Sequence, residues 1–387
     1  MSILVFTGYY LPGYKGGGPI KTIKNLVENV DDFSFQVITN DRDLGEKYPY
    51  SNVTPGTWNN LNTYKVFYIQ PKFKGLGQIV SIIFNKKNGY IIYVNSFFSI
   101  KFSLIPILLG KVINKQIIVG PRGEFSEGAL KLKRTRKNIF IKIYKLLNLS
   151  KGVIFQASSK YEAEDIQRVL GSQVDILIAE DIGSQEFVEN IPIRKSKVKK
   201  AVFISRISPK KNLNMALEAL KKVQGTLIYD IYGPIEDETY WQQCQKTINN
   251  LPSNIKVQYK GELLPDQVVT KLSTYDFFFM PTKGENYGHV IAEALCAGLP
   301  LVISDTTPWR DLENLGIGWD LPLNNLDGFS KVIDKIIAMS NEQLYDTRKS
   351  VLIWAKQKFS QREAIEANLA MFHYAYNKKK GIDNVIQ

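Results

Sequence analysis

Two glutamates eight positions apart, Glu285 and Glu293, are the residues whose spacing best fits a binding site. They flank Asn286, Tyr287 and Gly288, and a strongly apolar run typical of a buried strand precedes them. A strand followed by a glycine and then a helix presents backbone N–H groups to a phosphate. We therefore predict that this segment holds part of a nucleotide. The alternative is that the two glutamates flank an ordinary packed helix.

The predicted helix begins at about Gly288, with Asn286 as its N-cap. The first N–H groups of a helix have no partner within it, so they would form an anion site. At about 1.5 Å per residue, Glu293 would lie roughly 7 Å farther along the axis. This is about the separation of a diphosphate from its ribose, whose hydroxyls a carboxylate can bind. Glu285, in the preceding loop, would reach the sugar side of the diphosphate.

Two further segments in the first half follow apolar runs. Gly17 and Gly18 belong to a glycine-rich turn that could bring backbone N–H groups to a phosphate, although it could also be a mobile turn. Arg122 could bind a sugar or a phosphate, and Glu124 could orient an acceptor hydroxyl. A structural salt bridge is the alternative for each of the last two.

Short apolar runs alternate with amphipathic stretches along the whole chain, which predicts parallel sheets built from βαβ units. The predicted strands of the first half are 3–7, 34–39, 65–69, 90–94, 116–119, 153–156 and 174–178, with helices near 20–30, 99–109, 137–147 and 160–170. The predicted strands of the second half are 201–205, 226–232, 255–259, 275–280 and 300–304, with helices near 213–222, 239–249 and 287–297 and a long helical tail over 342–377.

The polar, basic stretch 193–200 reads as an exposed linker between two domains. We predict an α/β fold with two doubly wound, Rossmann-like domains facing a central cleft. The expected domains are 1–190, which binds the acceptor and is joined by a C-terminal helix at about 360–387, and 198–358, which binds the donor. A ligand is expected in the cleft, at the carboxyl ends of the strands.

Positive charge is concentrated in the first half of the chain. Residues 1–150 contain 21 Lys and Arg against 8 Asp and Glu, whereas residues 151–387 contain 29 of each. This asymmetry predicts an anionic partner for the first half: a membrane surface, a phospholipid-like acceptor or a nucleic acid. The segment 131–147 combines cations with apolar residues at helical spacing, which is typical of an interfacial helix or of a core helix with a basic solvated face.

Two features bear on the compartment. The two cysteines, Cys244 and Cys296, have no C-x-x-C spacing and fit a reducing environment. We expect no signal peptide, and the apolar segment 91–109 is too interrupted for a spanning helix. The expected location is the cytoplasm or, peripherally, the cytoplasmic face of the inner membrane.

The C-terminal segment resembles the signature of the retaining GT-B enzymes of glycosyltransferase family 4. The resemblance rests on Glu285-x7-Glu293 with the following Gly298-Leu-Pro300, and it continues through 203–213, 231–234, 259–261 and 307–309. The stretch around Arg206 and Lys211 resembles the family's G-R-L-x-x-x-K-G turn, although Ser205 stands where the family usually has glycine. Family members often carry a histidine in the first half near a position where this chain has Arg122.

The resemblance implies that Arg206 and Lys211 neutralise the donor diphosphate. Two fixed cations and a helix N-terminus could stabilise a leaving nucleoside diphosphate without a metal, so we expect no metal and no cofactor. The predicted catalytic residues are Glu285, Arg206 and Lys211, and the predicted donor-binding residues are Glu293, Asn286, Tyr287, Gly288, Gly17, Gly18 and Gly261.

The sequence therefore predicts a retaining hexosyltransferase that moves a sugar from a UDP- or GDP-sugar to a glycan or a polyprenyl-diphosphate-linked glycan. The resemblance implies a role in bacterial surface polysaccharides such as capsule, O-antigen or lipopolysaccharide. A DNA-acting GT-B glucosyltransferase and a nucleotide-sugar epimerase are the enzymatic alternatives, and a sugar-nucleotide-binding pseudoenzyme is a third. No nucleic-acid partner is expected.

Overall fold

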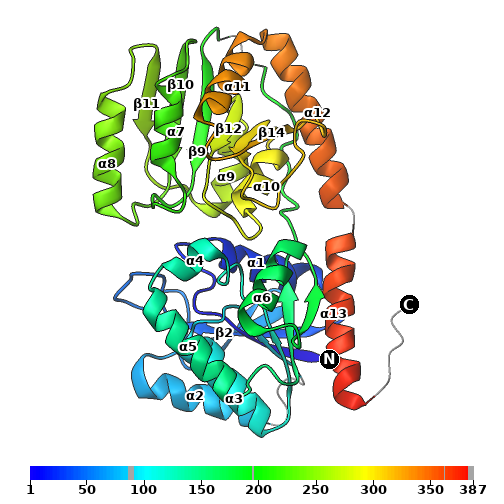
Figure 1. Ribbon diagram of the computed structural model, residues 1–387. Coiled ribbons are helices and arrows are strands. Elements are labelled where there is room, and N and C mark those ends of the chain that lie inside the picture. Colours follow the sequence, from blue (N-terminus) through cyan, green and yellow to red (C-terminus); the bar gives the residue numbers. More distant parts are fainter. Residues whose placement is uncertain (86–90, 194–195, 361, 382–387) are drawn as a thin grey trace. The chain divides into compact units, whose positions relative to one another are not determined.

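The computed structural model describes residues 1–85, 91–193, 196–360 and 362–381. The chain divides into two compact units, drawn in Figure 1. The first unit comprises Met1–Ile182 and Arg362–Gln387, and the second unit comprises Gly183–Gln361. The end of the chain therefore belongs to the same unit as its beginning.

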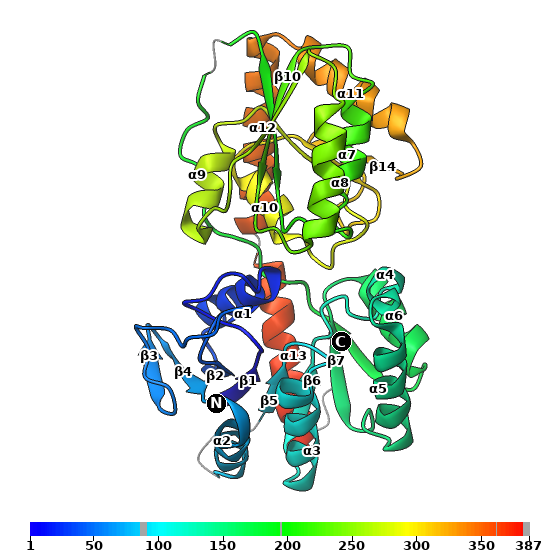
Figure 2. The ribbon, with the colours of Figure 1, turned by 90° about the vertical axis from the view of Figure 1, so that its left-hand side faces the viewer.

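The first unit contains an eight-stranded sheet in which all neighbouring strands are parallel except β3, which runs antiparallel to β4 at one edge (Figure 2). The strand order reverses between β1 and β5. From this topological switch, successive strands of the chain are added toward one edge of the sheet on one side and toward the other edge on the other side. In spatial order the strands are β3 (Trp58–Leu61), β4 (Tyr64–Ile69), β2 (Ser34–Asn40), β1 (Ser2–Phe6), β5 (Ile91–Val94), β6 (Gln116–Val119), β7 (Val153–Ala157) and β8 (Asp175–Ile178).

Helices cover both faces of this sheet, and each face has its own apolar core. Helices α1 and α13 pack on one face, where Ile23 and Phe372 are fully buried. Helices α2, α3, α5 and α6 pack on the other, where Ile107 and Tyr144 are buried. The helical elements are α1 (Gly18–Asn29), α2 (Lys72–Phe84), a π-helical turn (Ile100–Leu104), α3 (Ile105–Val112), α4 (Glu127–Lys131), α5 (Arg134–Leu146), α6 (Lys160–Leu170) and α13 (Glu363–Lys380).

The second unit contains a six-stranded, wholly parallel sheet around a single apolar core. Its central strand β12 is buried on both faces, as expected for a run of three phenylalanines and a methionine. In spatial order the strands are β11 (Ile255–Tyr259), β10 (Leu227–Tyr232), β9 (Lys199–Ile204), β12 (Phe277–Met280), β13 (Leu301–Ser304) and β14 (Gly318–Leu321). The helical elements are α7 (Leu213–Leu220), α8 (Glu238–Asn249), a 3-10 turn (Pro265–Gln267), α9 (Val268–Leu272), α10 (His289–Cys296), α11 (Leu326–Ala338) and α12 (Asn341–Ser360).

The predicted fold class of two α/β units with parallel sheets is confirmed. Every predicted strand is present with its ends within two residues of the prediction, although Tyr90, the first residue of one, lies outside the described residues. The prediction missed the helices α2, α4, α9 and α11 and the edge strands β3 and β14. Strand β3 contains two asparagines and β14 begins with a glycine, so neither shows the apolar pattern of a buried strand.

One prediction about the polar segments was wrong. Lys199 and Lys200 do not lie in an exposed linker, because they open strand β9, where Lys199 is buried and its Nζ donates to Asn341 at 2.8 Å. Arg194 and Lys195 of the same stretch lie outside the described residues. The tail predicted over 342–377 is helical as expected, but it consists of two helices, α12 and α13, and only α13 belongs to the first unit.

Candidate functional site

The three predicted catalytic residues, Arg206, Lys211 and Glu285, come from loops that follow two adjacent strands of the second unit. Strand β9 lies next to β12 in the sheet, so the loop carrying Arg206 and Lys211 adjoins the loop carrying Glu285. Backbone and side-chain hydrogen bonds join these loops: the Lys283 N–H donates to the carbonyl of Lys210 at 2.9 Å, and Asn212 Nδ2 donates to the carbonyl of Pro281 at 2.9 Å.

Lys211 and Glu285 form an ion pair at the carboxyl edge of this sheet. Lys211 Nζ lies 2.6 Å from Glu285 Oε1, and the two side chains are only 12% and 10% exposed. The same Glu285 oxygen accepts a hydrogen bond from Thr282 Oγ1 at 3.0 Å. Burial alone would raise the pKa of Glu285, but Lys211, Lys210 and the Thr282 hydroxyl together bring it below its ordinary value. Glu285 is therefore an anion that a cation fixes in place.

A buried hydroxyl cluster supports the loop beneath Glu285. Thr282 is fully buried, and its carbonyl accepts hydrogen bonds from Ser304 Oγ and from Thr306 Oγ1, the latter at 2.8 Å. Ser304 closes the neighbouring strand β13, so the loop after β12 is fastened to the strand beside it. The sequence analysis did not identify this cluster, although Ser304 follows a run of apolar residues.

Helix α10 begins at His289, and Gly288 is its N-cap in a left-handed conformation with φ of +83°. The prediction that Asn286 caps this helix is therefore wrong, because the capping position lies two residues later and carries no side chain that could accept a hydrogen bond. A Cβ at Gly288 would come within 2.9 Å of the Ile291 side chain. The glycine thus satisfies both the conformation and the close packing of this turn, and the first N–H groups of α10 follow directly.

Glu293 and Tyr287 both lie beside this turn and are buried, with exposures of 6% and 4%. Glu293 lies within α10 itself. The carbonyl of Tyr287 accepts a hydrogen bond from Trp309 Nε1 at 2.6 Å, and the Tyr287 ring contacts those of His289 and Trp309. Asn286 is half-exposed in the loop. The binding roles predicted for these residues stay predictions.

Arg206 lies in the same loop as Lys211 but is much more open to solvent. Its Nη1 lies 2.7 Å from Glu236 Oε1, and the two side chains are 37% and 44% exposed. The sequence analysis missed Glu236, which is 30 positions away. A Cβ at Gly233 would collide with the Ser205 carbonyl, so the two strand ends approach closely here. The carbonyl of Gly261 accepts a hydrogen bond from the Gly233 N–H at 2.8 Å, and a Cβ added at Gly261 would meet no atom beyond its chain neighbours within 4 Å.

The glycine-rich turn of the first unit lies directly before α1. Gly17 is the N-cap with φ of +69°, and Gly18 is the first helical residue. Asp43 Oδ2, from the loop after β2, accepts hydrogen bonds from the N–H groups of Tyr14 and Lys15 at 2.8 and 3.1 Å. This carboxylate, which the sequence analysis missed, orders the segment that leads into the glycines.

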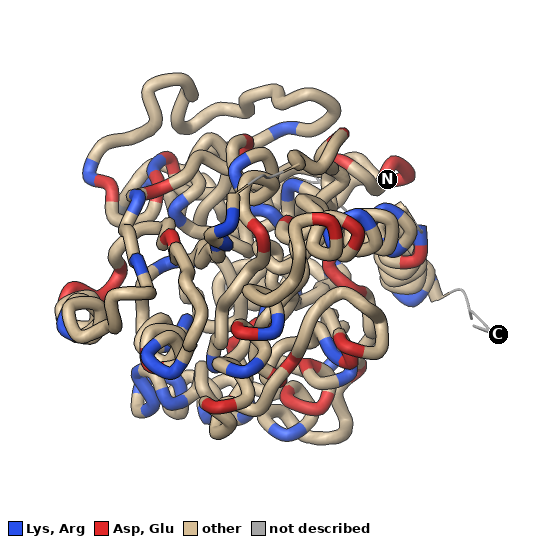
Figure 3. Tube along the Cα trace, turned by 90° about the horizontal axis from the view of Figure 1, so that it is seen from above, with Lys and Arg blue, Asp and Glu red and all other residues tan. Residues whose placement is uncertain are grey.

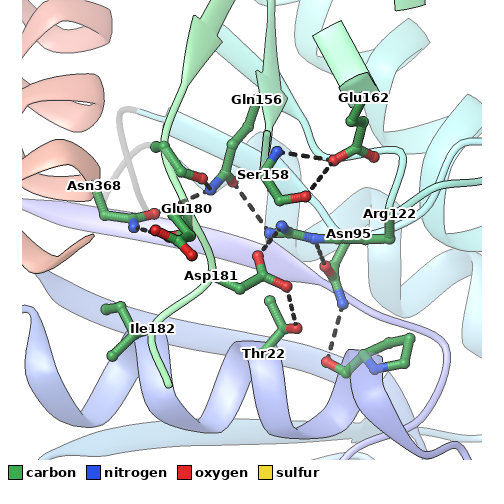
Figure 4. A network of polar contacts seen from close by, with 12 residues as sticks. Thr22, Asn95, Arg122, Gln156, Ser158, Glu162, Glu180, Asp181, Ile182 and Asn368 are labelled. Carbon is green, nitrogen blue, oxygen red and sulfur yellow. Dashed lines mark hydrogen bonds and ion pairs between the residues drawn. The ribbon is translucent and has the colours of Figure 1, made fainter. Parts of the chain in front are cut away.

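Arg122 lies at the centre of a buried polar network in the first unit (Figure 4). Its side chain is 6% exposed and forms an ion pair with Asp181, whose own side chain is 3% exposed. Its Nε donates to Asn95 Oδ1 at 2.7 Å, and its remaining N–H groups reach Tyr93 and Gln156. The salt bridge that the sequence analysis gave as an alternative for Arg122 is therefore present.

This network connects elements that are far apart in sequence. Asp181 also accepts from Thr22 Oγ1 of α1 at 2.9 Å, and Asn95 Nδ2 donates to the carbonyl of Pro19 at 3.2 Å. Gln156 Nε2 donates to Asn368 Oδ1 of α13 at 3.0 Å. The N-terminal turn of α1, next to the glycines, is thus held by the carboxyl ends of several strands.

Glu124 is a buried carboxylate that accepts hydrogen bonds from the segment directly after β5. It accepts hydrogen bonds from the N–H groups of Phe97 and Phe98 at 2.5 and 3.1 Å and from Ser96 Oγ at 2.9 Å. Burial raises its pKa despite these hydrogen bonds. An acceptor-orienting role for Glu124 stays a prediction.

Residues 184–350 match the model of the family described as Glycosyl transferases group 1. This part of the chain is a glycosyltransferase domain. The match covers nearly all of the second unit, including Arg206, Lys211, Glu285 and Glu293. It does not favour the DNA-acting or epimerase alternatives. No curated protein sequence matches the chain.

Solved structures similar to this glycosyltransferase share its fold over almost its whole length. HepE from Anabaena, in complex with UDP and glucose, has a TM-score of 0.69 at 15% identity and covers 97% of this chain and 100% of its own. Sucrose-phosphate synthase from Thermosynechococcus elongatus has a TM-score of 0.73 at 14% identity and covers 99% and 100%. WaaG, a glycosyltransferase involved in lipopolysaccharide biosynthesis, has a TM-score of 0.68 at 12% identity and covers 95% and 98%. The predicted GT-B fold is thereby confirmed.

Two further features of the described residues bear on membranes and metals. Within the described part of the glycosyltransferase, each helix is too short or too polar to span a bilayer. The described residues also contain no group of three or more His, Cys, Asp or Glu side chains arranged to hold a metal ion. Metal independence stays a prediction.

Proposed function

We propose that this glycosyltransferase transfers a hexosyl group from a UDP- or GDP-sugar to a glycan or a polyprenyl-diphosphate-linked glycan, with retention at the anomeric carbon. The observation that carries the proposal is the Lys211–Glu285 ion pair, placed between the loop after β9 and the loop that leads into α10. A cation and a helix N-terminus at one edge of a parallel sheet form a site for a pyrophosphate.

In the proposed reaction, the bond between the anomeric carbon and the diphosphate oxygen breaks, and an acceptor oxygen bonds to the same face of that carbon. The acceptor proton passes to the departing phosphate, so no separate base is required. Lys211, Arg206 and the first N–H groups of α10 offset the charge that develops on the leaving group, which is where a fixed positive field lowers the barrier most. Glu285 contacts the transferred sugar.

Glu293 and the glycines have binding roles in this proposal. Glu293, one and a half turns into α10, accepts hydrogen bonds from the ribose, while Asn286, Tyr287, Gly288 and Gly261 line the donor. Gly17 and Gly18 of the first unit keep their predicted role as donor-binding residues. That HepE was solved with UDP-glucose and with UDP supports a uridine nucleotide.

The acceptor is assigned to the first unit because all the excess positive charge of the chain lies in residues 1–150. A diphosphate-linked lipid acceptor is anionic, so this charge would attract it. Arg122 and Glu124 shape the acceptor side by holding the turns after β5 and β6. WaaG acts in lipopolysaccharide biosynthesis, which supports a surface polysaccharide as the product and the cytoplasmic face of the inner membrane as the place of work.

A thermal-shift panel of UDP, GDP and ADP with their sugars tests the proposal. The correct nucleotide should stabilise the protein by about 2.7 kcal/mol at a hundred times its Kd. The Lys211→Ala variant should lose this shift. The Lys221→Ala variant, which replaces an exposed lysine at the end of α7, should keep it. A protein that responds to none of the nucleotides, or whose Lys211→Ala variant responds like the wild type, would contradict the proposal.

A further inference from the structure

Only some of the apolar residues of helix α5 are on its buried, inward face. Tyr144 is 1% exposed, and its ring lies 4.7 Å from that of Phe97 between centroids. Phe140 packs against Phe98 at 5.5 Å, and Lys137 lies over the same Phe98 ring. These side chains fasten α5 to the sheet and belong to the core of the first unit.

The outward face of α5 carries a second apolar stripe. Ile139, Ile143 and Leu146 are 53%, 46% and 85% exposed. Their spacing of four and three residues places them side by side along the helix. Leu147, at the end of the helix, extends the stripe with an exposure of 53%, and Leu132, before the helix, is 60% exposed. Single exposed leucines are ordinary, but a contiguous exposed stripe marks an interaction surface.

Cations surround this stripe without any acidic neighbour in sequence. The trace in Figure 3 carries both signs of charge, but the segment from Gly128 to Tyr161 contains nine Lys and Arg and no Asp or Glu. Arg136 and Lys142 lie three residues before and after Ile139, so they adjoin the stripe on the helix surface. Six of the cations are exposed and make no ion pair with a described residue, namely Lys131, Lys133, Arg134, Arg136, Lys142 and Lys145.

We infer that this surface, α5 with Lys131–Lys133 before it and Leu147 after it, docks the protein on an anionic lipid bilayer. The apolar stripe inserts at the level of the acyl boundary, and the flanking cations contact the headgroups. Such a helix lies in the plane of the interface, which fits a helix of 13 residues that is already packed on one side.

Charge and chemistry favour a bilayer over other occupants. A nucleic acid would contact the cations but would leave the central apolar stripe without a partner. A second copy of the chain packed through the same face would bring two unneutralised clusters of cations together. An anionic bilayer offers both a negative surface and an apolar interior.

This inference deepens the proposed function, which places the enzyme at the inner membrane, but docking itself requires neither the donor nor the acceptor. It therefore fails or succeeds separately from the nucleotide-binding test. If the proposed lipid-linked acceptor is correct, the same surface would also bring the enzyme to its substrate.

Flotation of the full chain with vesicles tests the inference. The wild type should float with phosphatidylcholine vesicles containing about one third phosphatidylglycerol, but not with phosphatidylcholine alone, and binding should weaken with salt. The triple variant Ile139→Ser, Ile143→Ser, Leu146→Ser should bind at least about tenfold more weakly. The variant Arg136→Gln, Lys142→Gln, Lys145→Gln should weaken binding by about fivefold for each charge.

Matched variants in the second unit provide the controls. Leu264→Ser, Leu315→Ser, Ile353→Ser removes three apolar side chains that are 47%, 45% and 49% exposed, and Lys246→Gln, Lys256→Gln, Lys331→Gln removes three exposed cations. Both should float like the wild type, and all variants should keep the wild-type nucleotide response. A wild type that ignores anionic vesicles, or α5 variants that bind them normally, would overturn the inference. The inference would also be overturned if the protein bound no vesicles but bound a DNA duplex, and if the apolar triple variant bound that duplex as tightly as the wild type.

Discussion

Arg122 in the first unit and Arg206 in the second occupy similar places, because each follows the carboxyl end of a central strand. Their surroundings are opposite. Arg122 is buried and engaged by four side chains, whereas Arg206 is 37% exposed and pairs with one exposed glutamate. An arginine at the end of a strand is therefore not necessarily available to a ligand. In the first unit this position holds the fold, and in the second it is open to solvent.

The largest expected effect is on stability in the first unit. Arg122→Met leaves Asp181 charged and buried, which should lower the free energy of unfolding by about 3–5 kcal/mol. The double variant Arg122→Met, Asp181→Leu should recover part of this loss, since no unpaired charge remains. Denaturant unfolding followed by circular dichroism measures both. If Arg122→Met unfolds like the wild type, the ion pair is not structural.

The next effect is on catalysis in the second unit. Lys211→Ala should lower kcat/KM by about 10²–10³-fold, because it removes a fixed cation from the leaving diphosphate. Product formation from the nucleotide-sugar that the thermal-shift panel selects provides the measurement. Lys221→Ala is the control and should leave the rate unchanged. Near-normal turnover by Lys211→Ala would refute its assignment.

Arg206→Ala should have a smaller effect of about tenfold on kcat/KM, since a partly exposed cation is screened by water. The free energy of unfolding should change by less than about 1 kcal/mol, as is usual for exposed ion pairs. Glu236→Gln frees Arg206 and should preserve activity. A large loss of stability in Arg206→Ala would remove the contrast with Arg122.

The smallest effects concern pH, and they should have opposite signs in the two units. The pKa of Glu285 is below its ordinary value of 4.5, so the stability it contributes is present above that value and lost as the pH falls through the lowered pKa. The pKa of Glu124 is raised by burial, so its cost to the folded state appears as the pH rises from 4.5 through the raised pKa. Unfolding of the wild type, Glu285→Gln and Glu124→Gln between about pH 3 and 7 isolates each contribution. Equal slopes in all three proteins would contradict both assignments.

The sequence predicted the sheets well because buried parallel strands are apolar on both faces. Strands β6 and β11 and helix α6 have the predicted bounds. The placement of Lys211 and Glu285 in loops that follow two strands was predicted from the order of the strands and from the family resemblance. Asn286 was wrongly predicted as a cap because asparagine favours that position, whereas the backbone at Gly288 turns left-handed.

The partners of charged residues could not be predicted in the same way. Arg122 meets Asp181 across 59 positions, and Thr22 meets Asp181 across 159. Such pairs depend on which strand ends become neighbours in the folded sheet, and hydrophobic periodicity does not contain this information. The exposure of Ile139, Ile143 and Leu146 has the same origin, because the sequence alone does not show which of two apolar stripes faces the core.

The central claim is that the second unit binds the donor nucleotide. A crystal structure with the nucleoside diphosphate that the thermal-shift panel selects tests it most directly. We predict that the diphosphate contacts Lys211 and the N–H groups at the start of α10, with Glu293 hydrogen-bonded to the ribose. A nucleotide bound only to the first unit, with Glu293 and Lys211 touching neither ribose nor phosphate, would contradict the claim.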